Sequence, residues 1–295
     1  MDKKNDYKPH PNLHVPLAYE NKKFLNGPDG RTLRILAEYQ EPLAKFRRER
    51  IQDTIVFFGS ARFVSREESE RALTEVRKLP PDTPDLQEKI KRAESMVEMS
   101  QYYEAARRLA FLITQWAQTL NQPRHRFVVC TGGGPGIMEA ANRGAFEAGG
   151  KTIGLNINLP FEQVPNDYIT PALNFEFHYF FMRKLWFAYL AKALVVFPGG
   201  FGTFDEMFEV LTLAQTEKLA KHICVVVYGK PYWDEVVNLH AMVDAGTISA
   251  KDLDLIHWAN TPEEAFRILR TDLEEHHLEH ESTLLREPDI ARTRP

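Results

Sequence analysis

Short runs of apolar residues alternate with helical patterns along most of this chain. The runs lie at residues 55–58, 127–130, 152–155, 194–197 and 223–228, and a further strand is expected near 175–178. Helical patterns lie at 136–148, 181–193, 203–218, 232–245 and 262–273. Because strands that are apolar along their whole length are typical of a parallel sheet covered on both faces, the alternation predicts one α/β domain, doubly wound and mainly parallel.

Changes of composition along the chain predict its domain boundaries. Residues 1–50 are polar and contain five prolines, so we interpret them as an N-terminal extension with one helix around residues 33–49. The main domain is expected over residues 51–273. It includes a charge-rich helical insertion at 65–100, which leads into a long helix ending near residue 120. Residues 274–295 are polar and are expected to form a frayed tail.

The overall composition excludes several broad classes of protein. Hydrophobic residues make up 43% of the 295 residues and charged residues 26%, as in ordinary globular domains, and the formal net charge is −4. A weakly acidic chain has no general attraction for nucleic acid or an anionic membrane, so we expect neither as a partner. The N-terminus lacks the apolar segment of a secretory signal, and no apolar run reaches membrane-spanning length, which predicts a cytoplasmic protein.

The cysteines and the C-terminal histidines are residue types that bind metal ions in other proteins. Cys130 and Cys224 lie inside apolar runs and are predicted to pack in the core, with neither a disulfide framework nor the spacing of a cysteine-based zinc site. The segment HHLEH at 276–280 suggests a metal site, but a polar tail offers no rigid scaffold. We therefore expect these histidines to be solvated and expect no bound metal.

Two glycine-rich loops carry the strongest functional signal. Residues 131–139 read TGGGPGIME and residues 198–206 read PGGFGTFDE, and each segment follows a predicted strand and begins a helix. Glycines let backbone N–H groups approach an anion, and a helix start adds free donors and the positive end of its dipole. Either loop alone is also consistent with a tight turn, but the pair favours phosphate binding. The candidate phosphate-binding residues are Gly133, Gly134, Gly136, Gly199, Gly200, Gly202 and Thr203, with Gly59 and Ser60 after the first strand as a third contact.

The spacing of these glycines argues against two common nucleotide-binding motifs. A dinucleotide fingerprint that uses Gly132 and Gly134 requires glycine at position 137, where this chain has Ile137. The chain also lacks the GxxxxGK[ST] run of P-loop NTPases. A nucleotide or sugar phosphate therefore fits better than bound NAD or hydrolysed ATP, and an NAD-linked oxidoreductase is disfavoured.

Three charged residues near the loops are candidates for chemistry. Arg183 and Lys184 lie side by side in an apolar stretch, and Arg183 suits bidentate binding of a carboxylate or phosphate. If Gly202 and Thr203 start the next helix, Glu206 lies in its first turn, where the dipole favours the ionised carboxylate. Such a carboxylate can stabilise a ribosyl cation. The simpler interpretations are a helix-terminal charge pair for Arg183 and Lys184, and a helix-stabilising acid for Glu206.

Three segments together resemble the LONELY GUY family, whose members were long labelled lysine decarboxylase-like. They read TGGGPGIMEAAN at 131–142, FMRK at 181–184 and PGGFGTFDE at 198–206. The resemblance spans about residues 54–273, and the extension and insertion resemble the longer bacterial-type members. It implies a Rossmann-like homodimer that cleaves the N-glycosidic bond of nucleoside 5′-monophosphates, releasing a free base and ribose 5-phosphate.

The resemblance also implies roles for individual residues. Arg183 and Glu206 match the family's catalytic pair, and Lys184 matches its basic neighbour. Glu162 matches an acidic residue that contacts the substrate. The phosphate and ribose loop is matched by Gly199, Gly200, Gly202 and Thr203.

These observations predict a nucleotide phosphoribohydrolase that acts on AMP or on cytokinin riboside 5′-monophosphates without a metal or cofactor. We expect a homodimer or a larger even oligomer, since the helix near 100–120 and the aromatic segment 175–186 offer more apolar surface than one sheet face needs. The alternative is a regulatory protein that binds a nucleotide or alarmone without turnover. It would use the same loops, so only Arg183 and Glu206 separate the two hypotheses.

Overall fold

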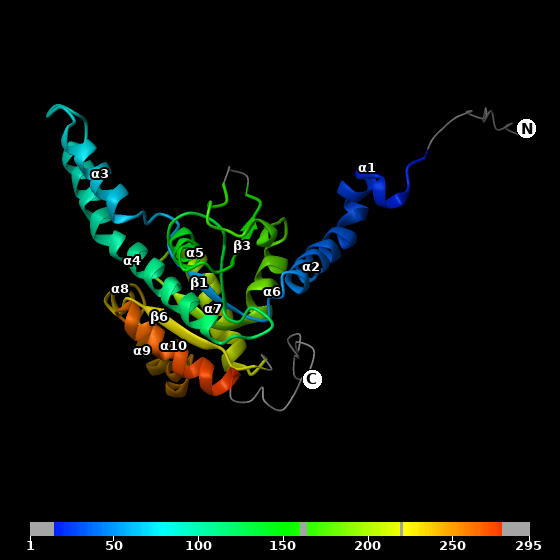
Figure 1. Ribbon diagram of the computed structural model, residues 1–295. Coiled ribbons are helices and arrows are strands. Elements are labelled where there is room, and N and C mark those ends of the chain that lie inside the picture. Colours follow the sequence, from blue (N-terminus) through cyan, green and yellow to red (C-terminus); the bar gives the residue numbers. More distant parts are fainter. Residues whose placement is uncertain (1–14, 160–163, 219–220, 279–295) are drawn as a thin grey trace, which may run out of the picture. The chain divides into compact units, whose positions relative to one another are not determined.

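The computed structural model describes residues 15–159, 164–218 and 221–278, and the chain divides into two compact units, residues 1–41 and 42–295 (Figure 1). The first unit contains the short helices η1 (Ala18–Glu20), α1 (Lys22–Asn26) and η2 (Pro28–Gly30), and α2 (Arg31–Arg48) begins in it. The Arg34 guanidinium donates to the Gly27 carbonyl over 2.8 Å, which holds the turn between α1 and α2.

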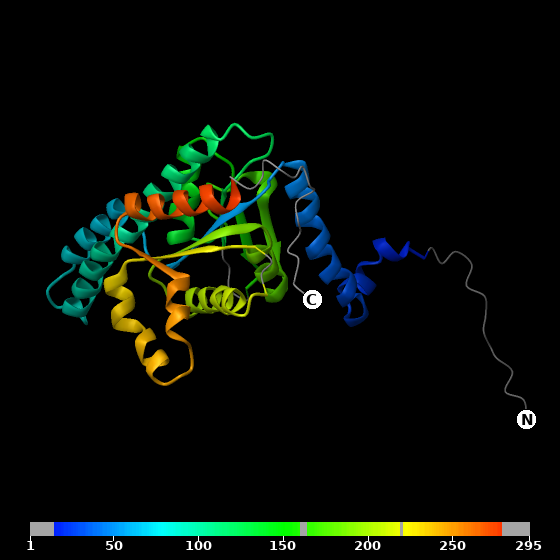
Figure 2. The same cartoon turned by 90° about the horizontal axis from the view of Figure 1, so that it is seen from below.

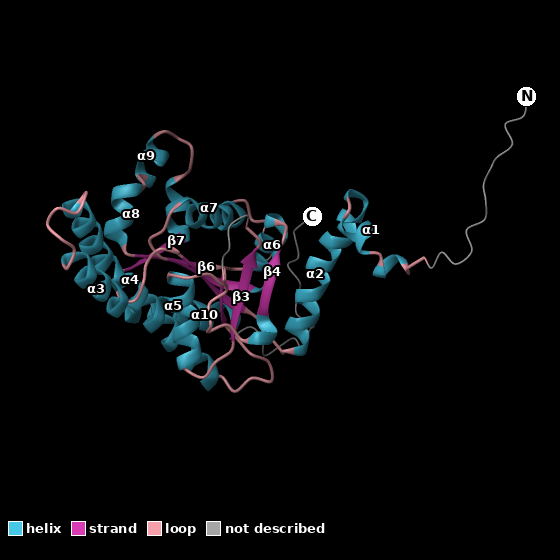
Figure 3. Cartoon of the chain, turned by 90° about the horizontal axis from the view of Figure 1, so that it is seen from above, coloured by secondary structure: helices cyan, strands magenta, loops and turns pink. Residues whose placement is uncertain are grey.

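Seven strands in the described part of the chain form one sheet in the second unit (Figure 3). They are β1 (Thr54–Phe58), β2 (Val128–Thr131), β3 (Thr152–Ile157), β4 (Asn174–Phe177), β5 (Ala191–Val196), β6 (Cys224–Tyr228) and β7 (Ile256–Ala259). Their order is β4-β3-β2-β1-β5-β6-β7, and every neighbouring pair is parallel. The predicted doubly wound, Rossmann-like α/β fold is confirmed.

Helices cover both faces of this sheet, as the continuous apolar strands require. Figure 2 shows α10 on one side of the strands and α7 on the other. The helices of the second unit are α3 (Arg66–Arg77), α4 (Leu86–Thr119), α5 (Ile137–Glu147), α6 (Phe180–Leu190), α7 (Phe201–Gln215), α8 (Lys230–Val236), α9 (Leu239–Asp244) and α10 (Pro262–His277), with short η3 (Pro171–Leu173) and η4 (Ala250–Leu255).

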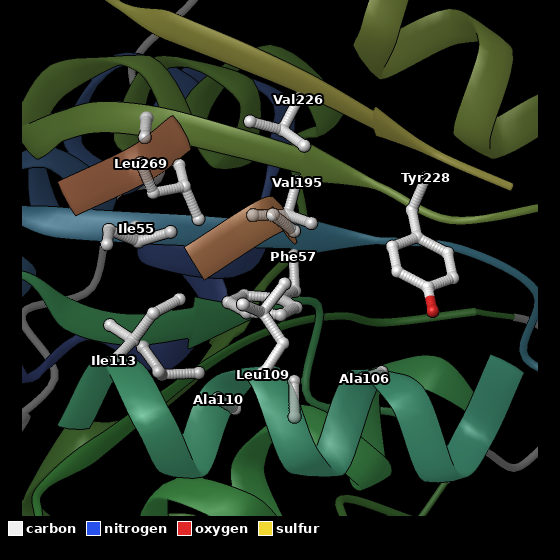
Figure 4. Close-up of a cluster of buried hydrophobic side chains, with 14 of the residues drawn as sticks. Ile55, Phe57, Ala106, Leu109, Ala110, Ile113, Val195, Val226, Tyr228 and Leu269 are labelled. Atoms are coloured by element: carbon white, nitrogen blue, oxygen red, sulfur yellow. The ribbon is translucent and has the colours of Figure 1, made fainter. Parts of the chain in front are cut away.

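The larger hydrophobic core lies between the sheet and helices α4, α5 and α10 (Figure 4). Phe57 from β1 and Leu109 and Ile113 from α4 are fully buried there, and Leu269 of α10 closes the cluster. Truncating one such side chain to alanine typically costs about 2–5 kcal/mol. On the opposite face, the rings of Phe58 and Phe187 pack edge to face with their centroids 4.9 Å apart, which holds α6 against β1.

The two halves of the long helix α4 pack against different parts of the protein. Its buried residues begin at Ser100, and from there it packs against α5 and the sheet. Its first half packs along α3 instead, as Figure 1 shows. Ser65 caps the start of α3 by accepting a hydrogen bond from the Glu68 N–H. Among the described residues, no helix is both long enough and apolar enough to span a membrane.

The structure differs from the sequence interpretation near the C-terminus. Sequence analysis gave no strand at β7, a short edge strand that contains the polar His257. The single helix expected at 232–245 is two helices, because Val237 is extended and Asn238 caps α9 by accepting from the Ala241 N–H. Helix α10 continues to His277, which is buried, rather than ending at Leu273.

Candidate functional site

Three loops meet at the carboxyl-terminal edge of the sheet. They follow β1, β2 and β5, which are neighbours in the sheet. From β1 the chain moves outward through β2, β3 and β4 on one side, and from β5 it moves outward through β6 and β7 on the other. Ligands of doubly wound proteins bind where the strand order reverses in this way, because the flanking loops leave a crevice between them.

Backbone hydrogen bonds join the three loops. The Ser60 N–H donates to the Pro198 carbonyl over 3.0 Å, and the Ile137 N–H donates to the Ser60 carbonyl over the same distance. A Cβ atom on Gly59 would lie 2.8 Å from the Ile137 side chain, so the first two loops can approach this closely only with glycine there. The three segments that sequence analysis predicted to contact phosphate therefore lie together.

The first glycine loop needs glycine for its backbone conformation. Gly133 and Gly136 have φ angles of +76° and +73°, in the left-handed region that other residues rarely adopt. A Cβ on Gly136 would also collide with the Ser60 carbonyl. The loop is thus held in one shape at the start of α5, where no side chain caps the helix.

Amide side chains support this loop, and the sequence pattern does not point to two of them, Asn156 and Asn166. The Asn166 amide donates to the carbonyls of Gly133 and Gly134 over 3.1 and 3.0 Å. Thr131 Oγ1 accepts from the Gly133 N–H and donates to Asn142, which is part of the recognised segment 131–142. Asn156 lies against Gly133 from β3. Asn156 and Asn166 carry no spacing signal, because their position depends on the order of the strands.

The second glycine loop presents the open start of α7. Helix α7 begins at Phe201, and no side chain caps it, so the first backbone N–H groups have neither an intrahelical nor a capping partner. A Cβ atom on Gly200 or Gly202 would meet nothing within 4 Å. Thr203 is buried, and its side chain packs against Gly199. Free donors beside open space are what an incoming phosphate requires.

Arg183 reaches the first glycine loop from α6. Its Nε donates to the Leu155 carbonyl over 2.7 Å, and its guanidinium lies 5.0 Å from the centre of the Phe187 ring. An Nη atom lies against Gly132, where a Cβ atom would collide with it. Burial lowers the pKa of Arg183, and the nearby Glu206 works in the opposite direction. The side chain is therefore fixed at its base while its terminal donors face the loop.

Glu206 is the buried acid of the site. Its side chain lies in the second turn of α7 and the residue is 8% exposed. Burial raises its pKa to about 7, although Arg183 and Lys184 both favour its ionised form. Arg183 and Glu206 attract each other without a direct ion pair within 4 Å in the described part of the chain.

The expected position of Glu206 in the first helical turn is wrong. The helix begins at Phe201 rather than at Gly202 or Thr203, so Glu206 lies beyond the reach of the strongest dipole effect. Desolvation then dominates, and it favours the protonated carboxyl instead of the carboxylate. The site therefore holds a carboxyl group that exchanges its proton near neutral pH.

Lys184 connects the two helices that carry the charged residues. Its ammonium group lies 2.9 Å from Asp205 and 2.7 Å from Glu209, both on α7. Burial opposes its charge, but the two carboxylates outweigh this and raise its pKa to about 12. Asp205 is largely exposed and points away from the buried Glu206, as the helical spacing predicts. Lys184 thus holds α6 against α7 rather than facing open space.

Part of the chain matches a known protein family. Residues 138–269 match the family model described as possible lysine decarboxylase, which is the LONELY GUY-type domain. This match covers β3 to α10 but not the first glycine loop or β1. A search of curated proteins gives no significant match.

Two solved structures are similar to this chain. The Moco carrier protein from Chlamydomonas reinhardtii is 20% identical, with 76% of this chain and 99% of that chain covered and a TM-score of 0.40. The protein TM1055 is 19% identical, with 74% and 99% covered and a TM-score of 0.43.

The matched segment contains the second glycine loop, helix α6 with Arg183 and Lys184, and helix α7 with Glu206. The structure brings Arg183, Lys184 and Glu206 together with the glycine loops. Glu162, the remaining predicted contact, lies outside the described residues.

Proposed function

We propose that this protein hydrolyses the N-glycosidic bond of nucleoside 5′-monophosphates. The observation that carries the proposal is the pairing of the buried Glu206 carboxyl with Arg183 beside two uncapped helix starts. A protein that only binds phosphate needs the helix starts. It has no need of a desolvated acid with a pKa of about 7 beside them.

Each part of the site has a role in this reaction. The starts of α5 and α7 bind the 5′-phosphate through backbone N–H groups and their dipoles. The guanidinium of Arg183, which lies against Gly132 of the first glycine loop, binds the substrate beside the start of α5. In this proposal the ribose lies near Glu206, whose ionised form stabilises positive charge as it develops at the anomeric carbon.

The bond changes follow from this placement. The bond between the anomeric carbon and the base nitrogen breaks, and its electron pair leaves with the base, which takes up a proton from solvent. A water molecule adds its oxygen to the anomeric carbon and gives a proton to the Glu206 carboxylate, which then releases that proton to solvent. The products are a free base and ribose 5-phosphate. AMP and a cytokinin riboside 5′-monophosphate are the substrates to compare.

The test is incubation with a panel of nucleoside monophosphates, assayed for free base and ribose 5-phosphate. Glu206→Gln should lower the rate by about 10²–10³-fold with little change in calorimetric AMP affinity, because the ground-state nucleotide carries no ribosyl cation. Arg183→Ala should lower both affinity and rate. Asp205→Asn is the matched control, since it removes the adjacent but exposed carboxylate and should leave the rate within a few-fold.

Two results would contradict the proposal. Hydrolysis by Glu206→Gln at the unaltered rate would leave Glu206 as a structural acid. Tight nucleotide binding by the unaltered protein with no base released from any substrate would favour a regulatory nucleotide-binding protein.

A further inference from the structure

Five potential metal ligands gather at the edge of the sheet opposite to the glycine loops. His222 lies two residues before β6, Cys224 begins β6, and His257 is the second residue of β7. Asp272 and His276 lie in the last turns of α10. Because the strands are parallel, the starts of β6 and β7 lie at the same, amino-terminal edge. This cluster is therefore separate from the site of Arg183 and Glu206.

Three of these residues form a compact group around one carboxylate. Nε2 of His222 lies 2.8 Å from Oδ2 of Asp272, and Nδ1 of His276 lies 3.8 Å from the same oxygen. The two imidazole rings are stacked, with centroids 3.9 Å apart. The ligand atoms of His222, Asp272 and His276 all lie within 4.8 Å of one another.

These separations are close to those of a metal-binding triad. Zinc binds imidazole nitrogen at about 2.0–2.1 Å and carboxylate oxygen at about 2.0–2.2 Å, so tetrahedral ligand atoms lie roughly 3.4 Å apart. The distances of 2.8 and 3.8 Å bracket this value. The spacing of four residues between Asp272 and His276 keeps both on one face of α10. Nδ1 of His276 is also 3.0 Å from the Asp272 backbone carbonyl oxygen, so binding an ion requires the His276 ring to turn away from that contact.

Two buried polar atoms in or beside this group have no hydrogen-bond partner among the described residues. They are Oδ1 of Asp272 and Nε2 of His277, both shielded from solvent. Cys224 and His257 lie on another side of the Asp272 carboxylate, also within 4.8 Å. An orphaned carboxylate oxygen beside imidazole groups is costly for a structural ion pair, whereas a bound cation would offset that cost.

We propose that His222, Asp272 and His276 bind one divalent transition-metal ion of the zinc class. Two imidazoles and one carboxylate suit zinc, cobalt(II) or nickel(II), while calcium and magnesium prefer oxygen ligands alone. The histidine side chains are 41% and 38% exposed, so an ion can enter from solvent, and Asp272 is 12% exposed. Three protein ligands leave one position of a tetrahedral ion open to water.

The rigid position of the histidines distinguishes this site from the solvated tail expected from sequence. His276 lies within α10, and the carbonyl of the next residue, His277, accepts a hydrogen bond from the buried Arg126 over 3.1 Å. A bound ion would connect the segment before β6 to this anchored helix end. Metal binding should therefore raise the melting temperature, because it occurs only in the folded state.

The experiment uses the full-length protein without a polyhistidine tag, stripped of metal by a chelator. Zinc chloride is titrated by calorimetry, and cobalt(II) chloride by visible absorption. We expect one ion per chain and a rise in melting temperature with zinc. His222→Gln and His276→Gln should each weaken zinc binding at least about 10-fold and abolish the rise. His240→Gln, on α9, is the control and should bind like the unaltered protein.

Two further measurements keep the result decisive. The metal-free variants should melt close to the unaltered metal-free protein, since both histidines are partly exposed, so lost zinc binding is not lost folding. Cys224→Ser should retain zinc affinity. Absence of binding, binding that survives both histidine substitutions, or a loss of affinity in Cys224→Ser equal to that in His222→Gln would overturn the assignment.

Discussion

The ionisation of Glu206 makes activity depend on pH. Its pKa of about 7 results from burial, and the proposed reaction needs the carboxylate. The value of kcat/KM for AMP should therefore rise as the pH increases through about 7 and reach a plateau above it. Base release measured from pH 5 to 9 checks this. A rate that stays level from pH 5 to 8 would show that no group with this pKa governs the reaction.

Gly132 leaves room for the Arg183 guanidinium because glycine has no Cβ atom. A Cβ atom there would meet the Nη of Arg183 and the Met138 sulfur, both at the ends of flexible side chains. Gly132→Ala should therefore displace the guanidinium at little cost in free energy of unfolding, within about 1 kcal/mol. We expect base release to fall at least about 10-fold. Urea unfolding and an AMP assay measure the two quantities, and full activity would show that Arg183 tolerates the shift.

At the scale of elements, the start of α7 combines two glycines with opposite requirements. A Cβ on Gly199 would collide with Thr203 and lie 3.0 Å from the Ser60 backbone nitrogen, so Gly199→Ala should lower the free energy of unfolding by about 1–3 kcal/mol. Gly202 lies inside the helix and faces open space. Gly202→Ala should raise stability by about 0.5–1 kcal/mol, since glycine is a poor helix former.

The Gly202→Ala variant also tests where the phosphate of AMP binds. The Gly202→Ala methyl group would point into the space assigned to phosphate, so AMP affinity should fall while stability rises. Urea unfolding and calorimetry on each variant report these effects. Unchanged affinity in Gly202→Ala would place the phosphate elsewhere.

A buried ion pair lies at the amino-terminal edge of the sheet, between the residues that precede β1 and β2, and Arg126 also donates to the end of α10. Asp53, just before β1, accepts from Nε of Arg126 over 2.7 Å, and both side chains are 1% exposed. Asp53→Ala should lower the free energy of unfolding by about 3–5 kcal/mol, because it leaves the Arg126 charge buried without its carboxylate. Glu70→Ala breaks the exposed pair with Arg66 and should change it by less than about 1 kcal/mol. Similar urea midpoints for both variants would contradict this account.

At the scale of the whole molecule, exposed aromatic side chains predict self-association. Phe201 is 96% exposed, Phe180 53% and Phe181 50%, and Lys184 connects the two helices that carry them. A second copy of the chain that covers these rings would remove apolar surface from water. Light scattering should give at least twice the chain mass of 34.0 kDa, and Phe201→Ser should weaken the assembly. A monomer at micromolar concentration would exclude it.

The sequence by itself indicated six of the seven strands in the described part of the chain, most of its helices and the segments that form the candidate site. Continuous apolar runs such as residues 223–228 mark buried strands, and the glycine runs mark the turns that lead into α5 and α7, because both signals are local along the chain. The position of Gly136 and the helical spacing of Asp205 and Glu206 follow from the same local rules.

Only the tertiary structure decided the properties that depend on neighbours distant in sequence. The elevated pKa of Glu206, the support of the first loop by Asn166 and the contact between Gly132 and Arg183 all arise from packing. The same is true of His276, which the sequence places in a polar tail and the fold places beside His222 on an anchored helix. Burial and electrostatic interaction depend on distance in space, and the order of the strands determines that distance.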